Sequence, residues 1–221
     1  MNDELKSRHA EAMRALAMAD ARLGAVIADV GPCRLGVHTS GPFHTPGYFE
    51  SLVESIVSQQ LSVKAADTIF GRVVALGGGK LPRPAELLVM PEETLRGAGL
   101  SGPKIKYLRD LCEKVTAGAL VLEELSALED EAVIERLRAV KGVGRWTAEM
   151  FLIFRLGRPD VLPVADLGIQ KGMKLLFNLR KDPAPERMEK LARPWRPYRS
   201  IACWYLWRFY ERSRARAGSG G

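Results

Sequence analysis

The chain has 221 residues, 47% of them hydrophobic, which is enough to bury a core in one large domain or in two small lobes. Its 33 Lys and Arg residues exceed its 26 Asp and Glu residues, and positions 180–221 hold eleven basic against four acidic residues. This balance favours a polyanionic partner, nucleic acid ahead of a membrane, although a solvated helix face would carry the same excess. No apolar run is long enough to span a bilayer and no signal-peptide pattern opens the chain, so we expect an intracellular protein.

Apolar residues recur at helical spacing along nearly the whole chain, which predicts an all-α fold. Proline, glycine and capping residues divide the pattern into short helices. In chain order, helices are expected over 3–19 and 20–29, over 49–57, from Ser62, at Pro84 and Pro91, after Ser101 and Asp130, over 145–156, from Asp166 and over 197–212, with a Gly- and Pro-rich connector over 31–47 and a disordered end after 215.

Three cysteines, Cys33, Cys112 and Cys203, lie far apart in the sequence. Their spacing matches no zinc site, iron–sulfur cluster or redox pair. We therefore expect three reduced thiols in the core.

The stretch LRAVKGVGRWTAEMFLIF, residues 137–154, predicts a helix, a tight turn and a second helix. Gly142 and Gly144 allow another backbone to approach closely, and they leave unpaired amides at the start of the second helix. These amides and the positive end of the helix dipole would suit a phosphate. Two glycines between helices are, however, more often a plain helix corner.

The longer pattern is more specific. It resembles the helix-hairpin-helix motif, and together with Asp166 at the end of GRPDVLPVAD it resembles the hairpin, Gly/Pro-rich loop and aspartate signature of the DNA glycosylase superfamily. SIVSQQLSVKAA, GLSGPKIKYL and RPWRPYRSIACWYLW are similar, in the same order, to the 3-methyladenine DNA glycosylase II branch. The resemblance runs from about Phe49 to Tyr210. A well-known bacterial form has an N-terminal β-rich domain that the helical residues 1–46 cannot supply, which implies a compact form.

The resemblance implies a monomeric enzyme that hydrolyses the N-glycosidic bond of alkylated purines in damaged double-stranded DNA and so initiates base excision repair. Asp166 would stabilise the sugar cation, although an aspartate at a helix start is also a common cap. Members that nick the backbone have a lysine nucleophile where this chain has Trp146, so a monofunctional enzyme with no catalytic cofactor is implied. A hydrophobic plug behind the turn is the other interpretation of Trp146. The base pocket would use Trp146, Trp204 and Met150, the last at a position where relatives can carry tyrosine.

Further roles follow from the same resemblance. Gln60, with Leu61 next to it, would be the wedge that fills the gap left by an extruded nucleotide, although an ordinary helix corner would fit this segment equally well. Phosphate contacts are expected from Gly142, Gly144, Arg145, Thr147 and Lys141. A monovalent cation, Na⁺ or K⁺, would bind the main-chain carbonyls of Arg138, Val140 and Val143.

Two alternatives stay open. A bifunctional glycosylase and lyase for another damaged base would need an amine at the site, for which Lys141 and Lys171 are candidates. A non-enzymatic helix-hairpin-helix DNA-binding protein would leave Asp166 without a task. In either case we expect two helical lobes, one from residues 1–60 and 158–221 and one from 61–157 that ends in the hairpin motif, with the active site in the cleft between them.

Overall fold

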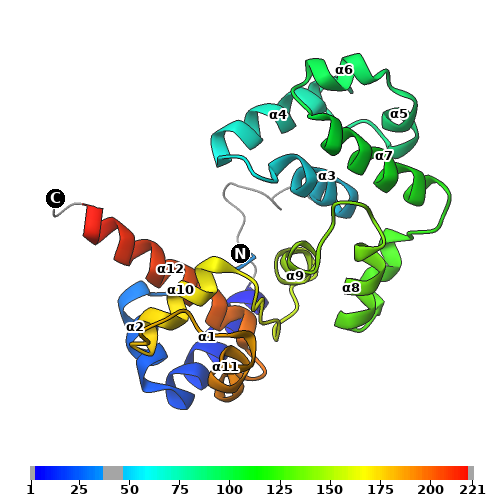
Figure 1. The fold of residues 1–221 in the computed structure, drawn as a ribbon. Coiled ribbons are helices and arrows are strands. Elements are labelled where there is room, and N and C mark those ends of the chain that lie inside the picture. The colour runs from blue at the N-terminus through cyan, green and yellow to red at the C-terminus, as the bar shows by residue number, and fades with distance from the viewer. Residues whose placement is uncertain (1–2, 37–46, 219–221) are drawn as a thin grey trace. The chain divides into compact units, whose positions relative to one another are not determined.

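The computed structural model describes residues 3–36 and 47–218, and their regular structure is entirely helical (Figure 1). The predicted all-α fold is therefore confirmed, while most of the connector expected over 31–47 lies outside the described residues. The elements are α1 (Asp3–Ala19), α2 (Ala21–Val30), α3 (Tyr48–Ser58), α4 (Val63–Ala75), α5 (Pro84–Val89), α6 (Glu92–Gly97), α7 (Gly102–Thr116), η1 (Leu122–Ala127), α8 (Asp130–Arg138), α9 (Arg145–Phe154), α10 (Leu167–Leu176), α11 (Pro185–Leu191), η2 (Arg193–Trp195) and α12 (Arg199–Gly218).

The chain divides into two compact units. The terminal unit comprises residues 1–37 and 157–221, and the middle unit comprises residues 38–156. The sequence predicts a boundary at residue 60, which would place α3 in the terminal unit. The structure corrects this boundary, because α3 packs against α4, α7 and α9 of the middle unit.

The middle unit is built around α3. Residues 51–57 of this helix are all buried, including the polar side chains of Ser51, Glu54 and Ser55. The ring of Tyr48 meets that of Phe151 edge-on, with 5.5 Å between ring centroids, and so joins the start of α3 to α9. Helices α5 and α6 pack on α7, which contacts α3 in turn. This arrangement brings the C-terminal end of α3 within reach of the turn between α8 and α9.

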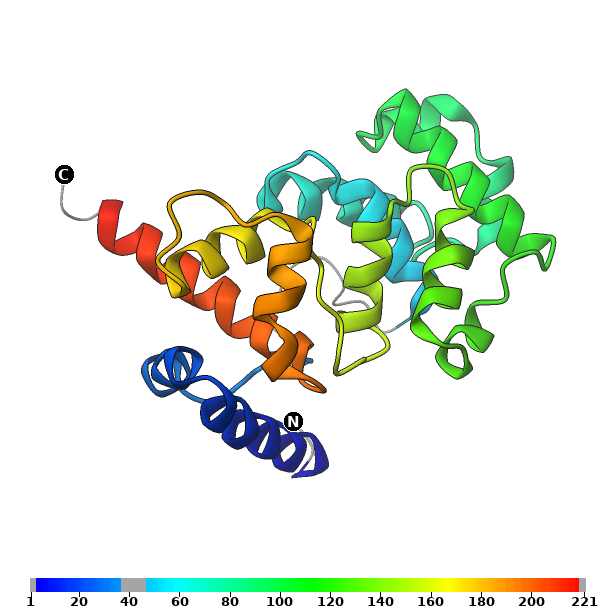
Figure 2. The same ribbon diagram turned by 60° about the horizontal axis from the view of Figure 1, so that its bottom comes forward.

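The terminal unit is built around α12. Helices α10 and α2 both pack along it, and α1 packs on α2 (Figures 1 and 2). Trp195 and Tyr205 are fully buried in this core. Gly172 lets α10 approach α12 closely, because a Cβ added there would lie 2.8 Å from the carbonyl oxygen of Leu206.

The three cysteines are buried thiols outside any disulfide, as expected. Burial raises the pKa of the Cys33 and Cys112 thiols to about 12, so both are protonated at neutral pH. These thiols are therefore inert packing groups.

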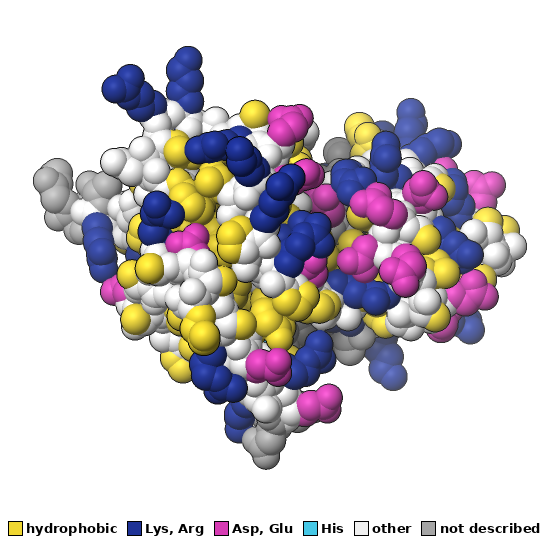
Figure 3. Space-filling view, turned by 90° about the horizontal axis from the view of Figure 1, so that it is seen from below, with side chains coloured by type: hydrophobic (Ala, Val, Ile, Leu, Met, Phe, Trp, Pro, Cys, Tyr) yellow, Lys and Arg dark blue, Asp and Glu magenta, His cyan; other side chains and the backbone are white. Residues whose placement is uncertain are grey.

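Basic residues are unevenly divided between the units. The terminal unit has 19 Lys and Arg against 11 Asp and Glu, whereas the middle unit has 14 against 15. Figure 3 shows Lys and Arg side chains at many places on the face it presents, with acidic and hydrophobic side chains among them. Within the described residues, no helix combines the length and the apolar character that a bilayer span requires.

Candidate active site

Asp166 lies at the point where the Gly/Pro-rich loop becomes α10. It is the N-cap of this helix, and its Oδ1 accepts the backbone N–H of Ile169 at 2.8 Å. The same oxygen accepts the indole N–H of Trp207, on α12, also at 2.8 Å. The side chain is only 9% exposed. The structure thus shows the expected capping role and, in addition, a tryptophan partner that the sequence did not indicate.

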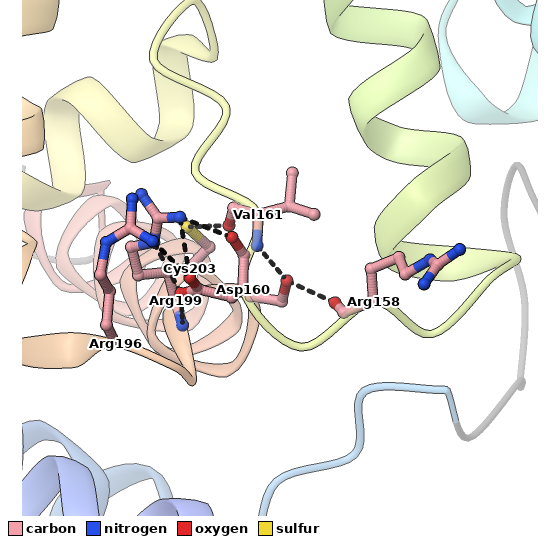
Figure 4. A network of polar contacts seen from close by, with 7 residues as sticks. Arg158, Asp160, Val161, Arg196, Arg199 and Cys203 are labelled. Carbon is pink, nitrogen blue, oxygen red and sulfur yellow. Dashed lines mark hydrogen bonds and ion pairs between the residues drawn. The ribbon is translucent and has the colours of Figure 1, made fainter. Parts of the chain in front are cut away.

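The loop that leads to Asp166 is fixed at Asp160. The carboxylate of Asp160 accepts hydrogen bonds from Nε and Nη2 of Arg199, at 2.6 and 2.9 Å, and from Nη1 of Arg196, at 3.0 Å (Figure 4). Arg199 further donates to the main-chain carbonyl of Asp160 at 2.8 Å. A bidentate arginine–carboxylate pair fixes the relative orientation of the two side chains as well as the distance between them. Asp160 therefore ties the loop to the start of α12.

Ser200 makes a second attachment between the same segments. Its hydroxyl donates to the carbonyl of Arg158 at 2.6 Å and accepts the N–H of Val161 at 3.0 Å (Figure 4). Its own N–H donates to the carbonyl of Pro159 at 2.9 Å, and the thiol of Cys203 lies 3.9 Å from the carbonyl of Val161. The sequence did not indicate the roles of Asp160, Arg199 and Ser200. Their only signal was the carboxylate of Asp160 in the Gly/Pro-rich loop, together with the arginines of RPYRS.

The predicted hairpin is present between α8 and α9. The N–H of Val143 donates to the carbonyl of Val140 at 3.1 Å and closes the turn. Gly142 has φ = 79°, and an added Cβ would lie 2.3 Å from the ring of Tyr107. Gly144 is the N-cap of α9 and has no side-chain cap on the helix start. A glycine at this position provides no side-chain acceptor for the first amides of α9, and a helix start of this kind suits an anion.

Asp110, on α7, holds the start of this turn. Its Oδ2 accepts the N–H of Lys141 at 2.9 Å and pairs with Nζ of Lys114 at 2.7 Å, and its Oδ1 lies 3.4 Å from Nζ of Lys141. Burial by itself raises the pKa of Asp110, but the bonds from Lys114 and Lys141 outweigh it and leave the pKa below its ordinary value. The carboxylate is therefore ionised at neutral pH and fixes Lys141 by both its main chain and its side chain.

The side chains of two other predicted phosphate ligands, Arg145 and Thr147, are less accessible to a phosphate. Arg145 binds Glu131 through both terminal nitrogens and Glu149 through Nε at 3.0 Å, and the bond to Glu131 raises the pKa of its guanidinium. A phosphate would have to compete with these carboxylates. The side chain of Thr147 is buried, so its hydroxyl is not on the surface. The main-chain amides are the better-placed donors at this helix start.

The predicted wedge segment follows α3 and contacts the hairpin. Nε2 of Gln59 donates to the carbonyl of Gly142 at 2.8 Å. Gln60 has φ = 58°, in the left-handed region that non-glycine residues rarely occupy. Nζ of Lys104, on α7, donates to the carbonyl of Val57 at 2.7 Å and so satisfies the end of α3. Gln60 thus has an unusual backbone conformation, and the residues just before it are attached to the hairpin and to α7.

A cavity of about 210 Å³ brings several predicted residues together within the middle unit. Gln60 and Leu61 line it, together with the half-exposed ring of Trp146, which is 43% accessible. The remaining lining is Ser55, Ser58, Gln59, Val63 and Ala66. An accessible tryptophan face at a cavity argues against a simple hydrophobic plug behind the turn.

The other two predicted pocket residues have different surroundings. Met150 is buried in α9, with 3% exposure, and is not part of this cavity lining. Trp204, on α12 of the terminal unit, meets Tyr205 edge-on with 4.9 Å between centroids, and the guanidinium of Arg208 lies 5.8 Å from its ring centroid. A cation already approaches that ring, which shows that it can serve as a cation–π partner.

Comparison with known proteins identifies the family. Residues 53–197, from within α3 to just before α12, match the model of the HhH-GPD superfamily of base excision DNA repair proteins. The chain belongs to this superfamily. The match includes the hairpin, the Gly/Pro-rich loop and Asp166, the three parts of the signature seen in the sequence.

Named relatives place this HhH-GPD protein near one branch. It is 41% identical over 162 residues to DNA-3-methyladenine glycosylase 1 of Schizosaccharomyces pombe, covering 72% of this chain and 71% of the relative. A DNA-3-methyladenine glycosidase structure from Bacillus halodurans superposes with a TM-score of 0.80 at 41% identity, over 92% and 91% of the two chains. The structure of S. pombe 3-methyladenine DNA glycosylase in complex with abasic DNA superposes with a TM-score of 0.78 at 37% identity, over 90% and 95%. The resemblance to the 3-methyladenine branch is therefore confirmed.

Proposed function

We propose that this protein is a monofunctional DNA glycosylase that hydrolyses the N-glycosidic bond of alkylated purines in duplex DNA and so initiates base excision repair. The observation that carries the proposal is the buried carboxylate of Asp166, which is held by two N–H donors at the start of α10. It ends the Gly/Pro-rich loop of a superfamily whose relatives near this chain are named 3-methyladenine glycosylases.

The chemistry needs little more than one well-placed anion. Alkylation at N3 or N7 puts a positive charge on the purine, so the base leaves as a neutral molecule without a general acid. The deoxyribose then develops positive charge, which the carboxylate of Asp166 stabilises until water adds. The N–H groups of Ile169 and Trp207 both donate to Oδ1 of Asp166, so donors from two helices orient this side chain at the start of α10.

A backbone-nicking activity has little support. Trp146 has no nucleophilic atom, and it stands where nicking members of the superfamily carry lysine. Nζ of Lys141 lies 3.4 Å from Asp110, and Nζ of Lys171 lies 2.6 Å from Asp182. The hydrogen bond to Asp182 raises the pKa of Lys171, which favours its protonated form, and a protonated amine does not attack a sugar carbon.

The hairpin would bind the DNA backbone. The main-chain amides after Gly144 and the dipole of α9 would attract a phosphate without reading the base sequence. The carbonyls of Arg138, Val140 and Val143 would hold a monovalent cation next to it. The donor set fits, because all are neutral oxygens and the Val140 carbonyl keeps a second lone pair beside its bond to Val143. Such an ion would add positive charge at the phosphate.

The extruded nucleotide would be replaced by the wedge segment. Gln60 and Leu61 flank the cavity at which Trp146 is accessible, so the segment that enters the duplex is continuous with an aromatic surface. Trp146 and Trp204 would offer ring faces to the damaged base, and a cationic base gains about 0.5–2 kcal/mol from such a face. Met150, which is buried, would act by shaping the packing behind Trp146.

One experiment separates the proposal from its alternatives. Methylated genomic duplex DNA is incubated with the protein, the freed bases are identified by mass spectrometry, and a parallel sample is treated with borohydride. We expect 3-methyladenine and 7-methylguanine to be released, with the abasic strand intact and no covalent adduct. A trapped adduct would instead establish the lyase, and Lys141→Ala and Lys171→Ala would identify its amine. Binding without any released base would establish a non-enzymatic DNA-binding protein.

A further inference from the structure

The carboxylate of Asp166 is attached to two different helices. The N–H of Ile169 belongs to α10, the helix that Asp166 itself caps, whereas the indole N–H of Trp207 comes from α12, 41 residues further along the chain. Both bonds are 2.8 Å long and both end on Oδ1. We propose that Trp207 is a positioning residue for Asp166, an inference that rests on the proposed function. Its indole N–H holds the carboxylate in the orientation that base release requires.

The geometry supports positioning rather than simple packing. A single hydrogen bond at a helix cap restrains a carboxylate side chain only weakly, because rotation about its last torsion is soft. A second donor that reaches the same oxygen from another helix adds a restraint on that torsion. Hydrogen bonds to an ionised acceptor are also shorter and stronger than those between neutral groups. Trp207 therefore restricts Asp166 in a way that the cap bond alone does not.

The sequence of α10 makes room for this contact. A Cβ added at Gly168 would lie 2.7 Å from Cδ1 of the Trp207 ring and 3.1 Å from both its Nε1 and Oδ1 of Asp166. One turn later, a Cβ at Gly172 would lie 2.8 Å from the carbonyl oxygen of Leu206. The two glycines thus allow α12 to approach α10 at Leu206 and Trp207. The contact between Trp207 and Asp166 depends on the absence of a side chain at Gly168.

Precise placement matters for the reaction because the carboxylate works by electrostatics. A fixed anion stabilises a developing cation without reorganising during the reaction, and this advantage is lost when the anion can rotate away. Loss of the indole donor should therefore slow the chemical step. DNA binding should be affected little, because the hairpin of the middle unit supplies the phosphate contacts.

The test compares variants that break this bond by different routes. Trp207→Phe keeps an aromatic ring but removes the N–H, and Gly168→Ala keeps the N–H but pushes the ring from its site. Trp195→Phe is the matched control, because Trp195 also donates its indole N–H to an aspartate, Asp20, at 3.2 Å in the same unit. The readouts are the single-turnover rate of 7-methylguanine release at saturating DNA, the Kd for duplex DNA and the melting temperature.

We expect Trp207→Phe and Gly168→Ala each to slow base release about tenfold while the Kd changes by less than about twofold. The double variant should be no slower than the slower single variant, because both changes remove one contact. Trp195→Phe should lower the melting temperature and leave the rate at saturating DNA unchanged.

Several results would overturn the inference: an unchanged rate for Trp207→Phe, rate losses that multiply in the double variant, or an equal rate loss for Trp195→Phe. Asp166→Asn, assayed in parallel, distinguishes failure of the inference about Trp207 from failure of the proposed function. If Asp166→Asn also releases base at the normal rate, it is the catalytic role of the carboxylate that is wrong.

Discussion

The turn between α8 and α9 offers a sharp comparison of two glycines that are two residues apart. Gly142 has φ = 79° and lies against the ring of Tyr107, whereas Gly144 has φ = −87° and no atom within 4 Å of an added Cβ. We predict that Gly142→Ala damages the hairpin and that Gly144→Ala, its matched control, does so far less.

The magnitude follows from two effects. An L-residue in the left-handed region costs about 1–2 kcal/mol. The new methyl group would lie 2.3 Å from the Tyr107 ring, and relieving such overpacking costs about 1–3 kcal/mol more. The free energy of unfolding should thus fall by about 2–5 kcal/mol for Gly142→Ala, a drop of roughly 4–20 °C in melting temperature for a chain of this size. At Gly144 only the weaker capping preference of alanine applies, at most about 1 kcal/mol.

Thermal unfolding followed by circular dichroism measures the loss of stability, and fluorescence anisotropy with a labelled duplex measures DNA affinity. We expect Gly142→Ala to lose both stability and affinity. Equal melting temperatures for the two alanine variants would refute the reasoning, because it would mean that neither the positive φ nor the Tyr107 contact constrains the turn.

Three further predictions concern single contacts. Gln59→Ala removes the bond to the carbonyl of Gly142, so the wedge segment should lose its fixed conformation and base extrusion, followed by 2-aminopurine fluorescence, should slow with little change in melting temperature. Asp160→Ala leaves the guanidinium of Arg199 without its carboxylate, which should cost about 1–3 kcal/mol in thermal unfolding and slow base release through the displaced loop. The pKa of Asp110 in the folded protein lies below its ordinary value of 3.8, so the stability that its carboxylate contributes is present above pH 3.8 and is lost as the pH falls further. Asp110→Asn should therefore reduce the fall of the melting temperature at acid pH, measured by thermal unfolding across a pH series.

Local features of the site could be predicted from the sequence. The turn at Gly142, the start of a helix at Asp166 and the cap at Ser62 each depend on a residue and its immediate neighbours. The sequence predicts that α12 ends at Arg212, because the apolar periodicity fades there, and this prediction is wrong. The helix continues to Gly218, and Arg212 and Arg216 pair with Asp29.

Contacts between distant segments could not be predicted in this way. Trp207 meets Asp166 across 41 residues, Arg199 meets Asp160 across 39, and Gln59 meets Gly142 across 83. An apolar stripe indicates that a helix is buried but not against which partner. For the same reason the predicted boundary at residue 60 is wrong, although the helix over 49–57 is confirmed as α3.

The most direct test of the account is the activity of Asp166→Asn, an isosteric change that removes the charge. The rate of 7-methylguanine release in single turnover and the Kd for the same duplex are measured for both proteins. The account predicts that release slows by at least about a hundredfold while the Kd stays within a few-fold of the original value. Release at the original rate, with DNA binding intact, would contradict the assignment of the catalytic anion to Asp166.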